Sequence, residues 1–269
     1  MLPSPTMKAI FSGLMSLVLS VSIQAKIVTK TVGYEQNGTK LAGYLAYDDE
    51  VTGKGKVPGV VVFPEWWGLN DYIKGRADQL AQMGYVAFAA DMYGAGESTT
   101  QPAKAKELAS QFYGKPLMAE RAQAALDQLL KTGLVDESKV AAIGFCFGGS
   151  TSLALAYTGA PLAGVVTFHG GLIPAPADAA QKTKAKFLIL HGALDPLVNK
   201  QAVDSFLKSM NDGKFDFQFV EYSGAVHAFT NPDADKAHAA GLDGLGYNAE
   251  AAARSWNQMK VFFSEIFGS

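Results

Sequence analysis

The clearest chemical signal in the sequence is a glycine-rich turn around the only cysteine of the chain. Cys146 lies in Gly144-Phe145-Cys146-Phe147-Gly148-Gly149, after a short apolar run and before a plausible helix at 150–157. This is the strand, turn and helix context of a nucleophile elbow, with sulfur in place of a serine oxygen. Side chains at Gly144 and Gly148 would collide with backbone in so tight a turn, and the helix N-terminus favours a thiolate. The pattern predicts a catalytic nucleophile rather than a packing turn or an inert buried thiol.

A cysteine nucleophile needs a general base, and the chain has four histidines. His227 alone follows the last expected strand, so it completes the hydrolase chain order of nucleophile, acid and histidine. His169 and His191 each end an expected strand and are interpreted as turn residues that line or support the site. His238 lies in an alanine-rich polar stretch and is expected to be exposed. His227 is therefore the predicted base.

The predicted acid is Asp195, in His191-Gly192-Ala193-Leu194-Asp195-Pro196, just after an expected strand. On its own, an aspartate before a proline is an ordinary helix cap. In combination with Cys146 and His227, Asp195 is predicted to fix the tautomer of the imidazole and to stabilise the imidazolium without taking the proton itself.

Such chemistry also requires two donors for the oxyanion of a tetrahedral intermediate. The backbone N–H of Phe147, the residue after the nucleophile, is one predicted donor. The second is expected in the loop after an earlier strand, which reads Pro64-Glu65-Trp66-Trp67-Gly68, and the N–H of Trp66 is the candidate. Core packing is the alternative interpretation for one of the two tryptophans.

These groups can meet only if the fold brings distant segments to one edge of a sheet. Short apolar runs predict strands buried on both faces, and stretches with helical spacing lie between them. The alternation predicts an α/β fold whose mainly parallel sheet has helices on both faces and its chemistry at the carboxyl ends of the strands. The expected strands are 57–63, 85–90, 140–143, 164–168, 187–190 and 215–222, after an antiparallel edge hairpin of 27–34 and 39–47; the expected longer helices are 71–83, 103–113, 116–131, 199–210 and 249–267.

Composition narrows the class of protein. A chain of 269 residues, 48% hydrophobic, can bury the core of one large domain, expected at residues 26–269. A net charge of -2 lacks the basic excess that phosphate backbones attract, so nucleic acid is not an expected partner. Histidines and acids show no zinc-ligand spacing, and the sequence contains neither a phosphate-binding loop nor a dinucleotide fingerprint. No metal and no organic cofactor are therefore expected.

The first 25 residues differ in character from the rest. Lys8 precedes an apolar run at 9–23, and Gln24-Ala25 supplies a small residue suited to cleavage. This order predicts a signal peptide at 1–25 and an exported protein, periplasmic in a Gram-negative bacterium or otherwise secreted; an apolar first helix of the fold is the alternative. No later apolar run approaches the ~20 residues needed to span a bilayer, so the mature protein is expected to lack a membrane span.

Five segments together resemble the dienelactone hydrolase family over roughly residues 27–267. They are Glu65 in P-E-W-W-G, Asp91-Met92-Tyr93, the cysteine elbow G-F-C-F-G-G, H-G-x-x-D-P and G-x-x-H-x-F. The resemblance implies an α/β-hydrolase fold with Cys146, Asp195 and His227 as its triad. It also implies that Glu65 holds the resting thiol through a hydrogen bond and helps to switch it to thiolate when substrate arrives. Judged without the resemblance, Glu65 is interpreted as a surface carboxylate.

The chain departs from this family at the positions that would bind a substrate carboxylate. Members that process dienelactone carry an arginine just after the D-L-Y segment, a serine after the histidine and another arginine nearby. Here those places read Gly94-Ala95 and Ala228, followed by Phe229-Thr230-Asn231. Without a cationic clamp, dienelactone itself is not the expected substrate. A neutral or aromatic ester, or another lactone, is expected instead, and the candidate substrate-binding side chains are Trp67, Tyr93 and Phe229.

The sequence thus predicts a hydrolase that cleaves a small-molecule carboxylic ester or lactone through a thioester acyl-enzyme. Two other classes of protein stay open. One is a binding protein with this fold that has lost turnover and holds a small apolar ligand. The other is a thiol redox sensor, against which stands the lack of a resolving cysteine.

Overall fold

The computed structural model describes residue 1 and residues 26–268 of the chain. The predicted signal peptide, apart from Met1, lies outside the described residues. Within the described part, no helix is long and apolar enough to cross a membrane.

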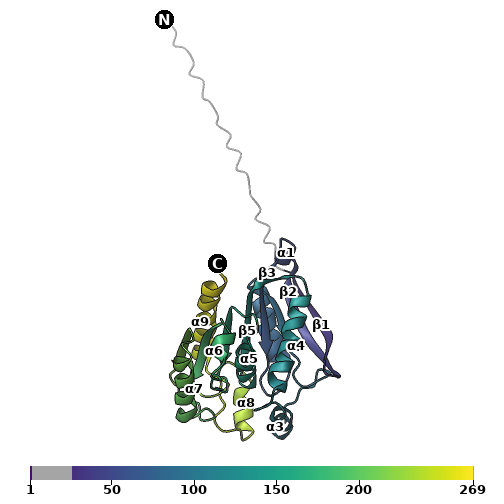
Figure 1. Cartoon of the computed structure of the whole chain (residues 1–269). Helices are drawn as coiled ribbons and strands as arrows, with labels where there is room; N and C mark the ends of the chain where they lie inside the picture. The colour runs from purple at the N-terminus through teal and green to yellow at the C-terminus, as the bar shows by residue number, and fades with distance from the viewer. Residues whose placement is uncertain (2–25, 269) are drawn as a thin grey trace.

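Eight strands form one sheet in the order β1-β2-β4-β3-β5-β6-β7-β8 (Figure 1). The strands β3 to β8 run parallel, while the hairpin of β1 and β2 is antiparallel and occupies one edge. This confirms the expected mainly parallel sheet with an edge hairpin. The strands are β1 (Ile27–Gln36), β2 (Thr39–Asp48), β3 (Val57–Phe63), β4 (Val86–Ala89), β5 (Val135–Phe145), β6 (Gly164–Phe168), β7 (Lys186–Gly192) and β8 (Phe217–Tyr222).

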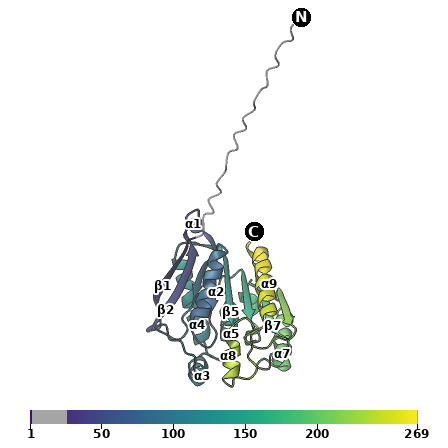
Figure 2. The ribbon, with the colours of Figure 1, turned by 180° about the vertical axis from the view of Figure 1, so that it is seen from behind.

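Helices cover both faces of the sheet, and each face has its own core. The helices α2 (Asp71–Gln82) and α9 (Ala249–Phe267) lie on the face seen in Figure 2. The opposite face, towards the viewer in Figure 1, carries α4 (Leu117–Lys131), α5 (Phe147–Tyr157) and α7 (Lys200–Asp212). Successive residues of β3 alternate between the two cores, with Val60 and Val62 in one and Val61 and Phe63 in the other. The sheet is therefore buried on both faces, as its apolar strands predict.

Several bounds differ from the sequence expectation, each for a local reason. β5 begins at Val135 rather than at 140. Residues 136–139 of this strand are polar and at least partly exposed, so they lack the apolar pattern of a buried strand. α5 begins at Phe147, immediately after Cys146, rather than at 150, because Gly148 and Gly149 in its first turn are poor helix formers and hide the start of the helix in the sequence. The shorter helices are α1 (Asp49–Thr52), α3 (Pro102–Ser110), α6 (Ala179–Lys182) and α8 (Ala234–Ala239).

The helices α3 and α8 lie together at one end of the molecule, beyond the carboxyl ends of the parallel strands (Figures 1 and 2). α8 belongs to the segment between Asn231 and Ala249, whose sequence, rich in Gly, Ala and Asp, is compatible with both a lid and a plain surface loop. Together these two helices frame the edge of the sheet at which the predicted site residues gather.

Candidate active site

Cys146 occupies a strained turn between β5 and α5. Its backbone has φ 53° and ψ -115°, a conformation that side-chain-bearing residues rarely adopt. A Cβ at Gly144 would overlap the backbone of Gly148, and a Cβ at Gly148 would overlap the carbonyl of Phe63 on β3. The expected need for glycine at both positions is confirmed. The backbone is held in place because the Cys146 N–H donates to the carbonyl of Phe168 at 3.1 Å.

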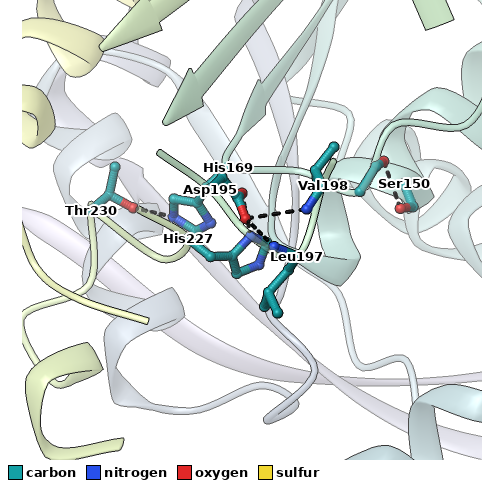
Figure 3. A network of polar contacts seen from close by, with 8 residues as sticks. Ser150, His169, Asp195, Leu197, Val198, His227 and Thr230 are labelled. Carbon is teal, nitrogen blue, oxygen red and sulfur yellow. Dashed lines mark hydrogen bonds and ion pairs between the residues drawn. The ribbon is translucent and has the colours of Figure 1, made fainter. Parts of the chain in front are cut away.

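Asp195 and His227 form a buried pair after β7 and β8. The Nδ1 of His227 lies 2.7 Å from Oδ2 of Asp195, and the other carboxylate oxygen accepts the N–H groups of Leu197 at 2.8 Å and Val198 at 3.3 Å (Figure 3). One oxygen of Asp195 therefore caps the backbone N–H groups of the following turn, as an aspartate before a proline commonly does, and the other contacts the imidazole. With Nδ1–H donating to the carboxylate, Nε2 is the ring nitrogen left for proton transfer.

The electrostatics of His227 favour its charged form. Burial lowers its pKa, but the negative charge of Cys146 and the hydrogen bond to Asp195 outweigh burial and raise the pKa to about 10. Cys146 and His227 line the same cavity. An imidazolium beside the sulfur stabilises a thiolate, which is the nucleophilic form of cysteine.

Glu65 lies in the same cavity but differs from both sequence expectations. It is only 1% exposed, so the surface interpretation is wrong. Its Oε2 accepts a hydrogen bond of 2.6 Å from Nδ2 of Asn231, and among the described residues it makes no hydrogen bond to the thiol that the resemblance implied. Burial raises the pKa of Glu65 to about 7, against the lowering effects of the Asn231 amide and of His227.

The two predicted oxyanion donors, Phe147 and Trp66, line this cavity together with Cys146. Among the described residues, the backbone N–H groups of Phe147 and Trp66 have no hydrogen-bond partner. Trp66 and Trp67 lie with their ring centroids 4.9 Å apart, and both line the cavity. The loop is anchored by Tyr93, whose hydroxyl donates to the Trp66 carbonyl at 2.8 Å.

The cavity has a volume of about 400 Å³ and mostly apolar walls. Tyr93 and Phe229 do not line it, which corrects their assignment as substrate contacts. The Tyr93 ring packs behind the wall against Phe147, while Phe229 is fully buried in the core on the face of α2 and α9. The lining residues are Glu65, Trp66, Trp67, Lys106, Ala109, Ser110, Tyr113, Cys146, Phe147, Gly171, Leu197, Val198, His227, Ala228 and Leu245.

The other histidines are distinct from His227 in their surroundings. His169 is buried, its ring lies 5.5 Å from that of His227, and its Nε2 contacts Oγ1 of Thr230 at 2.7 Å. Burial and the charge of His227 hold the pKa of His169 well below its usual range. His191 is also buried, and burial lowers its pKa; His238 is exposed, as expected. Neither His169 nor His191 lines the cavity.

A support behind the histidine loop was not predicted. Thr230 receives three contacts: its hydroxyl meets Tyr72 and His169 at 2.7 Å each, and its carbonyl accepts from Arg76 at 2.8 Å. The Arg76 guanidinium lies over the rings of Tyr72 and Trp256, 5.1 and 5.0 Å from their centroids. Thr230 could have been singled out by its closeness to His227 in sequence, but nothing in the sequence links α2 to this loop.

The comparisons with known proteins agree with this architecture. The sequence profile of the dienelactone hydrolase family matches residues 41–267. A crystal structure of a dienelactone hydrolase-like promiscuous phosphotriesterase, P91 from metagenomic libraries, superposes with a TM-score of 0.84 and 44% identity, covering 90% of this chain and 99% of that chain. Protein usf of Aquifex pyrophilus is 30% identical over 87% of this chain and 97% of its own length, and a protein of Saccharolobus solfataricus described as a putative carboxymethylenebutenolidase is 27% identical over 88% and 98%.

The fold and these relatives together define a carboxylic ester hydrolase with the α/β-hydrolase fold. Within that class, the chain belongs to the dienelactone hydrolase family.

The tight elbow predicts that Gly148→Ala destabilises the protein by about 1–3 kcal/mol, because the new methyl group must displace the carbonyl of Phe63. Gly75→Ala is a matched control, since a Cβ at this position in α2 meets nothing within 4 Å. Replacing a glycine inside a helix should raise the free energy of unfolding by about 0.5–1 kcal/mol. Urea unfolding of both variants checks the contrast. Equal stability of the two variants would contradict the described packing at the elbow.

Proposed function

We propose that the chain hydrolyses a carboxylic ester or lactone through Cys146, His227 and Asp195, with a thioester acyl-enzyme. The observation that carries the proposal is the strained cysteine elbow opening into the same cavity as a histidine whose Nδ1 is bonded to a buried carboxylate. Nucleophile, base and orienting acid in this arrangement are what acyl transfer requires.

In the first step, the Cys146 thiolate attacks the ester carbonyl and forms a tetrahedral intermediate. His227, protonated and oriented by Asp195, then gives its proton to the leaving alkoxide as the carbon–oxygen bond breaks and the thioester remains. In the second step, neutral His227 takes a proton from water, and the hydroxide releases the acid and restores the thiolate. The raised pKa supports the first transfer, because it keeps His227 protonated beside the resting thiolate until the alkoxide leaves, and the place of His227 in the cavity supports both transfers.

The N–H groups of Phe147 and Trp66 serve as the oxyanion donors in this proposal. Their lack of a partner among the described residues supports the role, because a donor already engaged in the resting protein could not receive the oxyanion without breaking a bond. Each such donor typically contributes ~3 kcal/mol to the transition state. Tyr93 acts here as a positioning residue, since it holds the carbonyl of Trp66.

The proposed substrate is a neutral or aromatic small molecule rather than dienelactone. Trp66, Trp67 and Tyr113 supply aromatic walls, and Lys106 is the only lysine or arginine among the described lining residues. Because Lys106 lies on the exposed face of α3, and the His227 imidazolium is already paired with Asp195, a carboxylate buried deep in the cavity would lack a lysine or arginine partner.

Phosphotriester hydrolysis is a second candidate function. The solved relative P91 is described as a promiscuous phosphotriesterase and is 44% identical to this chain. A neutral phosphotriester carries no free acid, which suits the apolar cavity, and the same thiolate could attack phosphorus and expel an alkoxide or aryloxide.

The nucleophile is tested by screening aryl esters, lactones and a neutral phosphotriester against the wild type and Cys146→Ala. We expect kcat/KM of the best substrate to fall by roughly 10³-fold or more, because the covalent step is lost. Stoichiometric iodoacetamide should abolish the wild-type rate, and since Cys146 is the only cysteine, labelling reports on it alone. A wild type as slow as Cys146→Ala would favour a binding protein, and full turnover after complete alkylation would exclude the cysteine mechanism.

The role of Glu65 is tested by pH dependence. Below about pH 7 its carboxyl is protonated and neutral, and above it the carboxylate attracts the imidazolium of His227, the group that pairs with the thiolate and protonates the leaving alkoxide. We expect kcat/KM of the wild type to rise several-fold as the pH rises through about 7, and Glu65→Gln to lose this pH dependence. Glu97→Gln changes an exposed carboxylate that does not line the cavity, and this control should keep the pH dependence. An unchanged profile in Glu65→Gln would remove Glu65 from the mechanism.

We also propose that residues 1–25 are a signal peptide removed on export. The support is the order of Lys8, the apolar run at 9–23 and Ala25 in the sequence. N-terminal sequencing of the protein from a periplasmic or secreted fraction should begin at Lys26. A mature chain that begins at Met1 or Met7 would contradict cleavage.

A further inference from the structure

A second cavity, of about 330 Å³, lies beside the one that contains Cys146. Three residues, Trp67, Ala228 and Leu245, contribute to the walls of both cavities. At the shared wall, Ala228 offers only a methyl group and directly follows His227. The boundary between the two cavities is therefore next to the proposed base.

The walls of the second cavity are built onto the same loops that hold the site. The Thr99 N–H donates to the Trp67 carbonyl at 2.9 Å, and Gly68 pairs with Ser98 as an antiparallel bridge. On the other side, Leu245 forms a parallel bridge with His227. The His227 N–H donates to the Gly244 carbonyl and the Gly246 N–H donates to the His227 carbonyl, each at 3.1 Å. α8 closes the far wall with Ala237 and the adjoining Ala240.

The chemistry of the second cavity differs from that of the first. Its walls include the neutral polar side chains Asn70, Thr99, Thr100 and Asn231. Asp233 and Lys236 also line it, but they form an ion pair of 2.5 Å with each other. Asn231 is already engaged by Glu65 and by the Asp233 N–H, but the Asn70 amide nitrogen and the Thr100 hydroxyl have no partner among the described residues. The cavity thus offers free hydrogen-bonding groups without an uncompensated charge, which suits a neutral polar group better than an ion.

We propose that this second cavity binds the alcohol arm of the substrate, and that this arm is a neutral chain bearing hydroxyl or ether oxygens. The inference rests on the proposed function, because the leaving alkoxide must lie beside the imidazole that protonates it. Ala228 continues the wall from His227 into the second cavity, so the alcohol arm is the part of an ester that extends there. The acyl arm then occupies the aromatic first cavity.

The test compares benzoate esters that differ only in the alcohol: methyl benzoate, octyl benzoate and triethylene glycol monobenzoate. For the wild type we expect kcat/KM to be about tenfold or more higher for the glycol ester than for the methyl ester, with the octyl ester below the glycol ester. Ala240→Trp, which fills the second cavity alone, should remove the advantage of the glycol ester and leave methyl benzoate within about twofold.

Ala239→Trp is the matched control, because Ala239 is the neighbouring exposed residue of α8 and does not line the cavity. It should retain the preference for the glycol ester. Equal rates for methyl and glycol esters, or a preference that survives Ala240→Trp, would overturn the inference while leaving ester hydrolysis intact. A preference for the octyl ester would overturn the polar assignment. Failure of the proposed function itself would appear differently, as a methyl benzoate rate in the wild type no greater than that of Cys146→Ala.

Discussion

The structure depends on one close approach of backbone to backbone, where the turn between β5 and α5 lies against the end of β3. Gly148 lies so near the carbonyl of Phe63 that no side chain fits between them. That approach holds Cys146 at a positive φ and places it at the N-terminus of α5. Backbone strain at this one residue is stabilised by the buried strands on either side, which cannot move apart without opening both cores.

Positioning of the histidine follows a different principle, because its loop contains no regular strand or helix. The loop is held at three residues: His227 by Gly244 and Asp195, Thr230 by α2 and by His169 just after β6, and Asn231 by Glu65. Each tie comes from a different part of the chain. Cys146 is thus positioned by the strand and helix on either side of it, whereas His227 is positioned by several hydrogen bonds to a short loop.

Features of the fold and site that depend on neighbouring residues could be predicted from the sequence, and features that depend on distant residues could not. The glycines around Cys146 and the apolar strands follow from short-range geometry, and both are present as expected. Phe229 could not be placed by its closeness to His227, because the positive φ of Ala228 turns the chain between them, so one side chain enters the cavity and the other the core. The burial of Glu65 depends on Asn231, which lies 166 residues away in the sequence, and no local pattern predicts such a partner.

The Arg76 guanidinium connects the C-terminal helix α9 to the loop that carries His227. It lies over Trp256 of α9 while its Nη2 donates to the carbonyl of Thr230. A rearrangement of α9 against the sheet therefore reaches the histidine loop through a single side chain. In evolutionary terms, substitutions on that distant helix can tune the alignment of the imidazole without altering any residue that a substrate touches.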